Sequence, residues 1–284
     1  MTPAQGPAGQ WAQILLWDNA ENDENKGTIM LKTLKHQVNV LESVATSSFA
    51  AWRGCLVIKA VPQPEKPLVL YDIEACPYCR RVREVLTALH LDVEIRPCPK
   101  GGRVFRPEAE ALGGKQQFPL LHDHNTGEVL YESEAIIEYL FRQYAHRSVP
   151  RYYQSRPWQP ALGAAGSGAS ELRGMRARPA RRPEQGLHLW SFEGSPFSRL
   201  IREKLCEYEI PYTLHNLGKE HWTEAGPARQ RIKPGPYRPI PGGKRDAFFQ
   251  QHGRVQVPYL EDPNTGEGLF ESARILDYLE KTYG

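Results

Sequence analysis

Two stretches of this chain occur twice. The segment YDIEACPYCRRVREVL, which begins at Tyr71, matches WSFEGSPFSRLIREKL, which begins at Trp190. Further along, FPLLHDHNTGEVLYESEAIIEYLFRQY from Phe118 matches VPYLEDPNTGEGLFESARILDYLEKTY from Val257, after a longer spacer in the second copy. Because the matched stretches share the positions of their prolines and turn residues, they indicate a duplicated domain.

Each copy has the pattern of a compact α/β unit. In the first copy, the apolar residues 68–70 predict a buried strand. Pro77 suits the first turn of a helix, where a missing N–H costs nothing. The helix that follows is predicted from one apolar face, formed by Val82, Val85, Leu86 and Leu89.

The rest of the first copy continues this alternation of strands and helices. Residues 93–95 predict a second strand, and residues 106–112 predict a short helix that ends at Gly113. Residues 120–130 predict a hairpin around the turn H-N-T-G, and residues 133–144 predict a closing helix. The predicted order is strand, helix, strand, helix, strand, strand, helix.

These patterns divide the chain into four segments. Residues 67–146 and 187–284 are the two α/β copies. Residues 147–186 are rich in Pro, Gly, Ala and Arg and predict a linker with solvated arginines. Residues 1–66 form an N-terminal extension with one amphipathic helix, which we expect to dock on a domain through Leu31, Leu34, Val38 and Leu41.

Charge and cysteine usage exclude several classes of protein. The net charge is only +3, and no aromatic residues are interleaved with the linker arginines, so we expect no nucleic-acid partner. No stretch approaches the ~20 apolar residues of a membrane span, so we expect no membrane partner. Five cysteines with one close pair do not form a secreted disulfide framework. A cytoplasmic location is therefore expected, with an organellar stroma as the alternative.

The C-P-Y-C motif at residues 76–79 is the strongest chemical feature. It joins a predicted strand to a predicted helix, so the Cys76 sulfur faces the free N–H groups of the helix start. The arginines at 80, 81 and 83 add positive charge, and both effects favour a thiolate. Cys79 is close enough to form or resolve a disulfide. A zinc site would need a second ligand pair, and none is evident at suitable spacing.

These residues resemble two known families. The C-P-Y-C junction resembles a dithiol glutaredoxin, and Phe118-Pro119 with Glu132-Ser133 resembles the N-terminal domain of glutathione S-transferases. The resemblance implies two tandem thioredoxin-like domains and a cis-proline. It also implies a glutathione site in which the backbone before the proline pairs with the cysteinyl unit and the acidic residue and serine hold the γ-glutamyl end. The residues implied at this first site are Tyr78, Phe118, Pro119, Glu132 and Ser133.

This sequence departs from both families. Glu74 stands where glutaredoxins usually carry a lysine, and a nearby carboxylate would raise the pKa of Cys76 unless the arginines and the helix outweigh it. The all-helical domain with which glutathione transferases bind hydrophobic electrophiles has no counterpart in this sequence. Ordinary conjugation therefore has no obvious pocket.

Topology adds two residues to the first site. Parallel strands of a strand–helix–strand unit end at the same sheet edge, so Cys98 and Lys100 should lie near Cys76. We expect Lys100 to hold the glycyl carboxylate of glutathione. Cys98 is either a third redox thiol or an ordinary half-buried cysteine.

The second copy has Ser195 and Ser198 in place of the two cysteines, so it cannot form mixed disulfides there. Its S-P-F segment resembles the motif of serine-type glutathione transferases, which implies that Ser195 could activate a glutathione thiol. The glutathione-holding set is repeated by Lys219, Val257, Pro258, Glu271 and Ser272.

The resulting hypothesis is a glutathione-dependent disulfide oxidoreductase with Cys76 as nucleophile and Cys79 as resolving thiol. Glutathione is the expected cofactor, disulfides or glutathionylated proteins are the expected partners, and no metal is expected. Two alternatives remain: a glutathione transferase acting on small polar electrophiles, and a non-catalytic module that binds glutathione or an iron–sulfur cluster. The oligomeric state and the role of residues 1–66 are left open.

Overall fold

The computed structural model describes residues 30–48, 52–154, 172–221, 224 and 237–284. The chain forms two compact units, residues 1–41 and 42–284. A helix occupies residues 30–48, as the amphipathic pattern predicted. The docking of the first unit stays a prediction. The sheet and its helices belong to the second unit.

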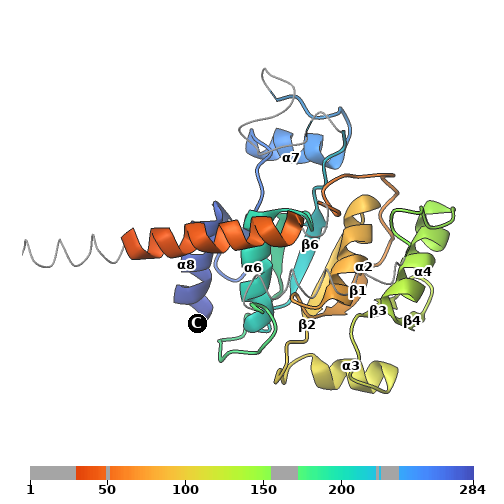
Figure 1. The fold of residues 1–284 in the computed structure, drawn as a ribbon, viewed down its shortest axis with the longest axis horizontal. Helices are drawn as coiled ribbons and strands as arrows, with labels where there is room; N and C mark the ends of the chain where they lie inside the picture. The colour runs from red at the N-terminus through yellow and green to blue at the C-terminus, as the bar shows by residue number, and fades with distance from the viewer. Residues whose placement is uncertain (1–29, 49–51, 155–171, 222–223, 225–236) are drawn as a thin grey trace, which may run out of the picture. The chain divides into compact units, whose positions relative to one another are not determined.

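The second unit is built on one eight-stranded mixed sheet with strand order β4-β3-β1-β2-β6-β5-β7-β8. Its elements follow one another in the same order in each half of the chain (Figure 1). The first half comprises β1 (Leu68–Asp72), α2 (Pro77–Ala88), β2 (Val93–Pro97), α3 (Arg106–Gly113), β3 (Leu120–Asp123), β4 (Glu128–Tyr131) and α4 (Ser133–Ala145). The second half comprises β5 (Leu187–Ser191), α6 (Pro196–Glu207), β6 (Tyr212–Asn216), α7 (Lys244–His252), β7 (Tyr259–Asp262), β8 (Glu267–Phe270) and α8 (Ser272–Tyr283).

The predicted order of elements in the first copy is therefore confirmed, and with it the mixed α/β class. The apolar face of α2 packs beside α4, and α6 packs beside α8 in the same way. Strands β1 and β2 are parallel, with Asp72 opposite Pro97, so both end at one edge of the sheet. Strand β3 is antiparallel to β1 on the other side, and its start lies at that same edge, with Leu120 opposite Tyr71.

The two halves are joined through their second strands. Strands β2 and β6 pair antiparallel, with Val93 opposite Leu214 and Ile95 opposite Tyr212. One apolar cluster runs through this junction and contains buried residues from both halves. The copies therefore share a sheet and a core, which the repeat pattern could not reveal.

A buried charge network also connects the halves. Arg83 of α2 donates from Nε to Glu193 Oε2 at 2.9 Å and from Nη1 to Asp72 Oδ1 at 2.7 Å. The equivalent Arg202 of α6 bonds from Nη2 to Glu74 at 3.1 Å and to Glu193 at 3.1 Å. These side chains are almost completely removed from solvent. Removing one partner of such a network leaves an uncompensated buried charge.

Two further segments, missed in the sequence, cross between the halves. We call residues 52–58 the first arm and residues 172–178 the second arm. The first arm pairs with the second half, where Leu56 forms a parallel bridge with Lys219. The second arm pairs with the first half through a bridge between Lys100 and Arg176. Part of the predicted linker is thus packed structure.

The expectation of solvated linker arginines was wrong for Arg173. Its guanidinium pairs with Glu203 at 2.9 Å and with Glu42 at 2.6 Å. Glu203 lies on α6, so the pair fixes the start of the second arm against that helix. No helix in the described part of the chain is long and apolar enough to cross a membrane.

Candidate functional site

Cys76 lies at the point where β1 has ended and α2 begins. It is the N-cap of α2, with extended backbone angles (φ −77°, ψ 124°), and Pro77 occupies the first helical turn. Its carbonyl accepts a hydrogen bond from the N–H of Arg80 at 3.0 Å. The Cys76 side chain is half-buried, whereas Cys79, one turn further on, is completely buried. The Cys76 sulfur is therefore the more accessible of the two.

The surroundings of Cys76 favour its thiolate. Its pKa falls from the ordinary 9.0 to about 7, chiefly because the Cys79 thiol donates a hydrogen bond to it. The backbone N–H groups of Cys79 and Tyr78 contribute in the same direction, while burial and the Asp72 carboxylate oppose them. Burial and the nearby Cys76 sulfur raise the pKa of Cys79. The pair therefore consists of one thiolate and one thiol near neutral pH.

Asp72, the last residue of β1, lies beneath this pair. Burial raises the pKa of its carboxyl group, while the Arg83 guanidinium and a hydrogen bond from Cys79 act against that rise. Its carboxylate is close enough to Cys79 to accept the one S–H hydrogen bond that this thiol otherwise donates to the Cys76 sulfur. It is positioned to accept the proton that Cys79 must lose before it can attack a disulfide. Asp72 belongs to no motif of the sequence, so it was not among the predicted site residues.

The expected electrostatics of the Cys76 thiol need two corrections. Arg80 and Arg81 are not the main cause of its lowered pKa, because Arg80 pairs with Glu84 at 3.1 Å and Arg81 points to the start of α4. Glu74 is not a main opposing charge either, since its carboxylate pairs with Arg83 and Arg202. Thiol and backbone donors dominate because they contact the sulfur directly.

The predicted glutathione-holding residues lie on one flank of Cys76. The Phe118–Pro119 peptide bond is cis, as the resemblance implied, and Pro119 is buried directly before β3. Ser133 begins α4, and its hydroxyl accepts a hydrogen bond from Arg81 Nη1 at 3.4 Å. Glu132 is exposed, has a positive φ of 66° and is contacted by Gln117. The exposed Glu132 carboxylate can bind an ammonium, and the N–H groups at the start of α4 can bind a carboxylate. Together they could hold a group that carries both charges.

The opposite flank contains Lys100 and Cys98. The N–H of Cys98 donates to Asp72 O at 2.6 Å, which places the end of β2 beside the end of β1. Lys100 is exposed, so its ammonium is available to a carboxylate. Cys98 is fully buried, and burial raises its pKa. This environment favours a packing role for Cys98 over that of a third redox thiol.

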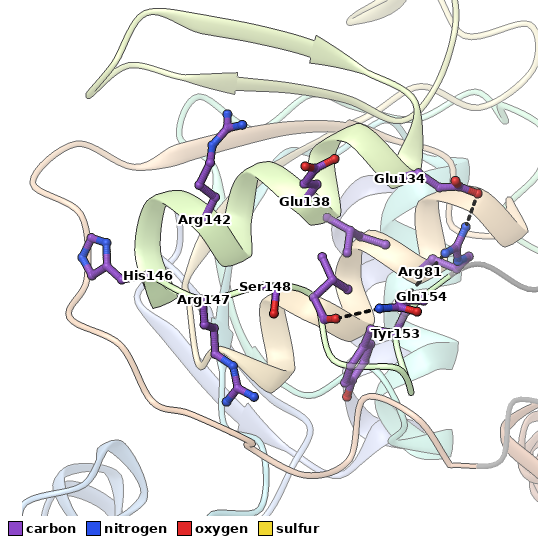
Figure 2. A pocket seen from close by; sticks show the side chains of 11 residues that line it. Arg81, Glu134, Glu138, Arg142, His146, Arg147, Ser148, Tyr153 and Gln154 are labelled. Carbon is purple, nitrogen blue, oxygen red and sulfur yellow. Dashed lines mark hydrogen bonds and ion pairs between the residues drawn. The ribbon is translucent and has the colours of Figure 1, made fainter.

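An open groove of about 690 Å³ lies along α4 and the segment that follows it (Figure 2). Arg81 and Glu134 form an ion pair at 3.4 Å at one end, and Arg142 and Arg147 line the other part. Most of the residues that line the groove are polar or charged, and they do not include Cys76. The groove meets the predicted γ-glutamyl end of the first site through Arg81, which also bonds Ser133.

The second half repeats the site with different access. The Val257–Pro258 bond is cis, Glu271 has a positive φ of 71°, and Ser272 is buried at the start of α8. Ser195 is only 3% exposed, and its hydroxyl accepts hydrogen bonds from the backbone N–H and the hydroxyl of Ser198. Lys219 follows β6 as Lys100 follows β2.

Residues from the N-terminal side cover the Ser195 loop. Ser43 Oγ donates to Pro196 O at 2.8 Å, and Gly194 N donates to Gly54 O at 2.9 Å. The Cys55 sulfur packs against Gly194 so closely that a Cβ at Gly194 would lie 2.2 Å from it. Burial raises the pKa of Cys55 to about 11. Ser195 is thus much less accessible than Cys76.

The fold and these repeated loops define a class: a mixed α/β protein in which a strand-to-helix loop and a cis-proline loop each occur twice on one sheet. The glutathione S-transferase N-terminal domain model matches residues 70–148 and 189–284, and the chain belongs to this family. No curated protein matches it. Among solved structures, it is similar to TDR1, a trimeric glutathione transferase of Leishmania, at 15% identity over 75% of this chain and 68% of that one, with a TM-score of 0.24.

Proposed function

We propose that this protein is a glutathione-dependent thiol–disulfide oxidoreductase acting through Cys76 and Cys79. The observation that supports the proposal best is the half-buried Cys76 sulfur at the start of α2, with a pKa of about 7. Family membership supports a glutathione-related function. The pairing of a thiolate with a buried thiol one turn away favours disulfide exchange within that function.

The reaction begins when the Cys76 thiolate attacks the disulfide of a glutathionylated protein. Attack on the glutathione sulfur breaks the substrate S–S bond, forms a Cys76–glutathione disulfide and releases the protein thiolate, which takes a proton from water. A second glutathione thiolate then attacks the glutathione sulfur of this mixed disulfide. Glutathione disulfide leaves and the Cys76 thiolate is regenerated. Each turnover therefore consumes one added glutathione thiol, whose sulfur is oxidised while the sulfur of the protein thiol is reduced.

Cys79 offers a second route from the mixed disulfide. Asp72 accepts the Cys79 proton, and the new thiolate attacks the Cys76 sulfur. This step releases glutathione and leaves a Cys76–Cys79 disulfide, which two glutathione molecules then reduce. Glutathione is held by the backbone of Phe118 beside Pro119 and by Glu132 and Ser133 in this proposal.

We further propose that residues 67–146 and 187–284 are two thioredoxin-like units, and that residues 147–186 connect them. Residues 187–284 have serines, Ser195 and Ser198, at the positions of the two redox cysteines. Their Lys219, Val257, Pro258, Glu271 and Ser272 would bind glutathione only when the segment over Ser195 moves away.

The test is reduction of a glutathionylated peptide by glutathione, coupled to glutathione reductase. Cys76→Ser should lose activity by at least about 1000-fold, because serine cannot form the mixed disulfide. Cys79→Ser should retain turnover through the second glutathione. Native protein that binds glutathione but reduces no disulfide would contradict the proposal.

One observation favours a second candidate, transfer of glutathione to small polar electrophiles. The groove of Figure 2 is lined largely by charged residues, among them Arg81, which also bonds Ser133, so a polar acceptor could lie beside glutathione there. Conjugation of a chloronitroaromatic compound that survives in Cys79→Ser and is lost in Arg81→Met would support this candidate.

A further inference from the structure

The second arm brings residues from outside the first half to the edge of the sheet beside Cys76. Its backbone runs next to Lys100: the Lys100 N–H donates to Met175 O at 2.7 Å, and the Ala177 N–H donates to Lys100 O at 3.0 Å. Lys100 and Arg176 are partners in a parallel bridge. The arm therefore extends the sheet edge at the point where β2 ends.

The arm is firmly positioned by residues near Cys76 and on α6. Gly174 approaches Glu74, two residues before Cys76, so closely that a Cβ there would lie 3.0 Å from the Glu74 Cβ. The Gly174 N–H donates to Glu207 Oε1 at 3.1 Å, and its carbonyl accepts from the Cys206 thiol at 3.1 Å. A Gly174 φ of +75° suits the turn that starts the arm.

Successive side chains of an extended segment point to opposite sides. Met175 points inward and packs on the apolar cluster that Cys76 and Phe118 also contact. Arg176 is exposed, and bridge partners present their side chains on the same side of the sheet, so it lies beside exposed Lys100. Within the described residues, neither cation forms an ion pair with a carboxylate, whereas Arg173 and Arg178 on either side do.

We propose that Arg176 and Lys100 form a two-cation subsite that binds a carboxylate of the disulfide substrate, making Arg176 a specificity-determining residue for acidic glutathionylated peptides. This proposal rests on the proposed function at Cys76. It assigns Lys100 to the peptide part of the substrate, in place of the glycyl carboxylate of glutathione that Lys100 was expected to hold. Pro119 and Ser133 lie toward β3, on the flank assigned to glutathione, while Lys100 and Arg176 lie toward β2. In a bound glutathionylated peptide, the peptide part extends from Cys76 away from the glutathione flank and toward the two cations. An arginine beside a lysine suits a carboxylate, which accepts charge-assisted hydrogen bonds from both.

The second half provides an internal contrast. There the first arm places Leu56, not an arginine, in the bridge with Lys219, and Cys55 occupies the inward position. The same backbone arrangement thus carries two cations only in the half that has the cysteine pair. Arg176→Leu gives the first site the residue found at the second.

The experiment uses two glutathionylated peptides of equal length, one with Glu on both sides of the modified cysteine and one with Ser. The glutathione part is common, so the comparison isolates the peptide flank. Native protein should show a KM about three- to fivefold lower for the acidic peptide, as expected for an exposed ion pair. Arg176→Leu should abolish this difference with kcat unchanged, and 0.5 M salt should reduce it in native protein.

The matched control is Arg182→Leu, an exposed arginine beyond the arm, which should keep the preference for the acidic peptide. Binding of both peptides to Cys76→Ser, with and without Arg176→Leu, tests the subsite without turnover. If native protein turns over neither peptide but Cys76→Ser binds the acidic one more tightly through Arg176, the proposed reaction fails and the subsite stands. Equal binding of both peptides, or a preference that survives Arg176→Leu, would overturn the inference.

Discussion

The two halves of this protein share the same order of strands and helices. They differ in the residue at the start of the first helix, α2 or α6, and in how exposed that residue is. In the first half, Cys76 is half-buried, and its sulfur accepts hydrogen bonds from the thiol and the backbone N–H of Cys79. In the second half, Ser195 is 3% exposed and lies beneath Ser43 and Gly54. Duplication kept the framework of the site and changed its chemistry and access. The difference supports redox chemistry in the first half and a structural role for the Ser195 loop.

The halves also depend on each other. Each arm precedes one half in the sequence and pairs with the other. The first arm pairs with Lys219 of the second half, and the second arm pairs with Lys100 of the first half. The charges of Glu74 and Glu193 are balanced by arginines from both halves. We therefore expect the halves to unfold together.

The largest effect should follow from breaking the charge network. Arg83→Met removes a buried cation and leaves Asp72 and Glu193 without their closest partner. Loss of one member of a buried ion network costs about 3–5 kcal/mol, so we expect a fall of this size in the free energy of unfolding. Denaturant titration followed by tryptophan fluorescence should still give one transition.

An exposed ion pair is the control for that measurement. Lys281→Met removes a pair with Asp277 on the surface of α8 and should change the free energy of unfolding by less than about 1 kcal/mol. Two separate transitions in native protein would contradict the mutual dependence of the halves.

The next effect concerns the thiols. A folded-state pKa of about 7 for Cys76, below the ordinary 9.0, corresponds to about 3 kcal/mol in favour of its thiolate. Since the lowered pKa belongs to an acid, the thiolate is present above pH 7 and is lost as the pH falls through 7. The rate of alkylation at Cys76 should rise about tenfold per pH unit below 7 and level off above it.

Cys79→Ala tests the cause of that shift. It removes the main hydrogen-bond donor to the Cys76 sulfur, so the midpoint should move up toward 9. Cys55, with a pKa of about 11, should show no plateau below pH 10 in the same samples, followed by mass spectrometry of each cysteine peptide. An unchanged Cys76 midpoint in Cys79→Ala would show that the helix start alone lowers its pKa.

A smaller effect should follow from altering the cover of the second site. Gly194→Ala introduces the residue found at the equivalent Ala75, but its Cβ would lie 2.2 Å from the Cys55 sulfur. Overpacking of this kind costs about 1–3 kcal/mol, which should appear as a loss of stability. Adding Cys55→Ala should recover part of it, because the smaller side chain makes room.

Hydrogen exchange of residues 52–58 gives an independent measure of the same change. The N–H of Val57, which donates to Lys219 O, should exchange faster in Gly194→Ala than in native protein. Equal stability and equal exchange in both proteins would show that the first arm does not pack tightly on the Ser195 loop.

The sequence predicted the local parts of this protein well. Cys76 at a helix start and the strand and helix ranges of the first copy followed from patterns within a few residues. The cis bonds before Pro119 and Pro258 followed from the family resemblance. Local patterns are sufficient here because a helix N-terminus and an apolar face are set by neighbours three or four positions away.

The tertiary structure alone decided how the copies combine. The pairing of β2 with β6, the burial of Arg83 against Glu193 and the contact of Gly54 with Gly194 join residues more than 100 positions apart. Such contacts leave no periodicity in the sequence, and Arg83 looked like one of several charges near Cys76. The physical reason is that the charge of a side chain shows its capacity for pairing, whereas only the folded chain determines its partner and its burial.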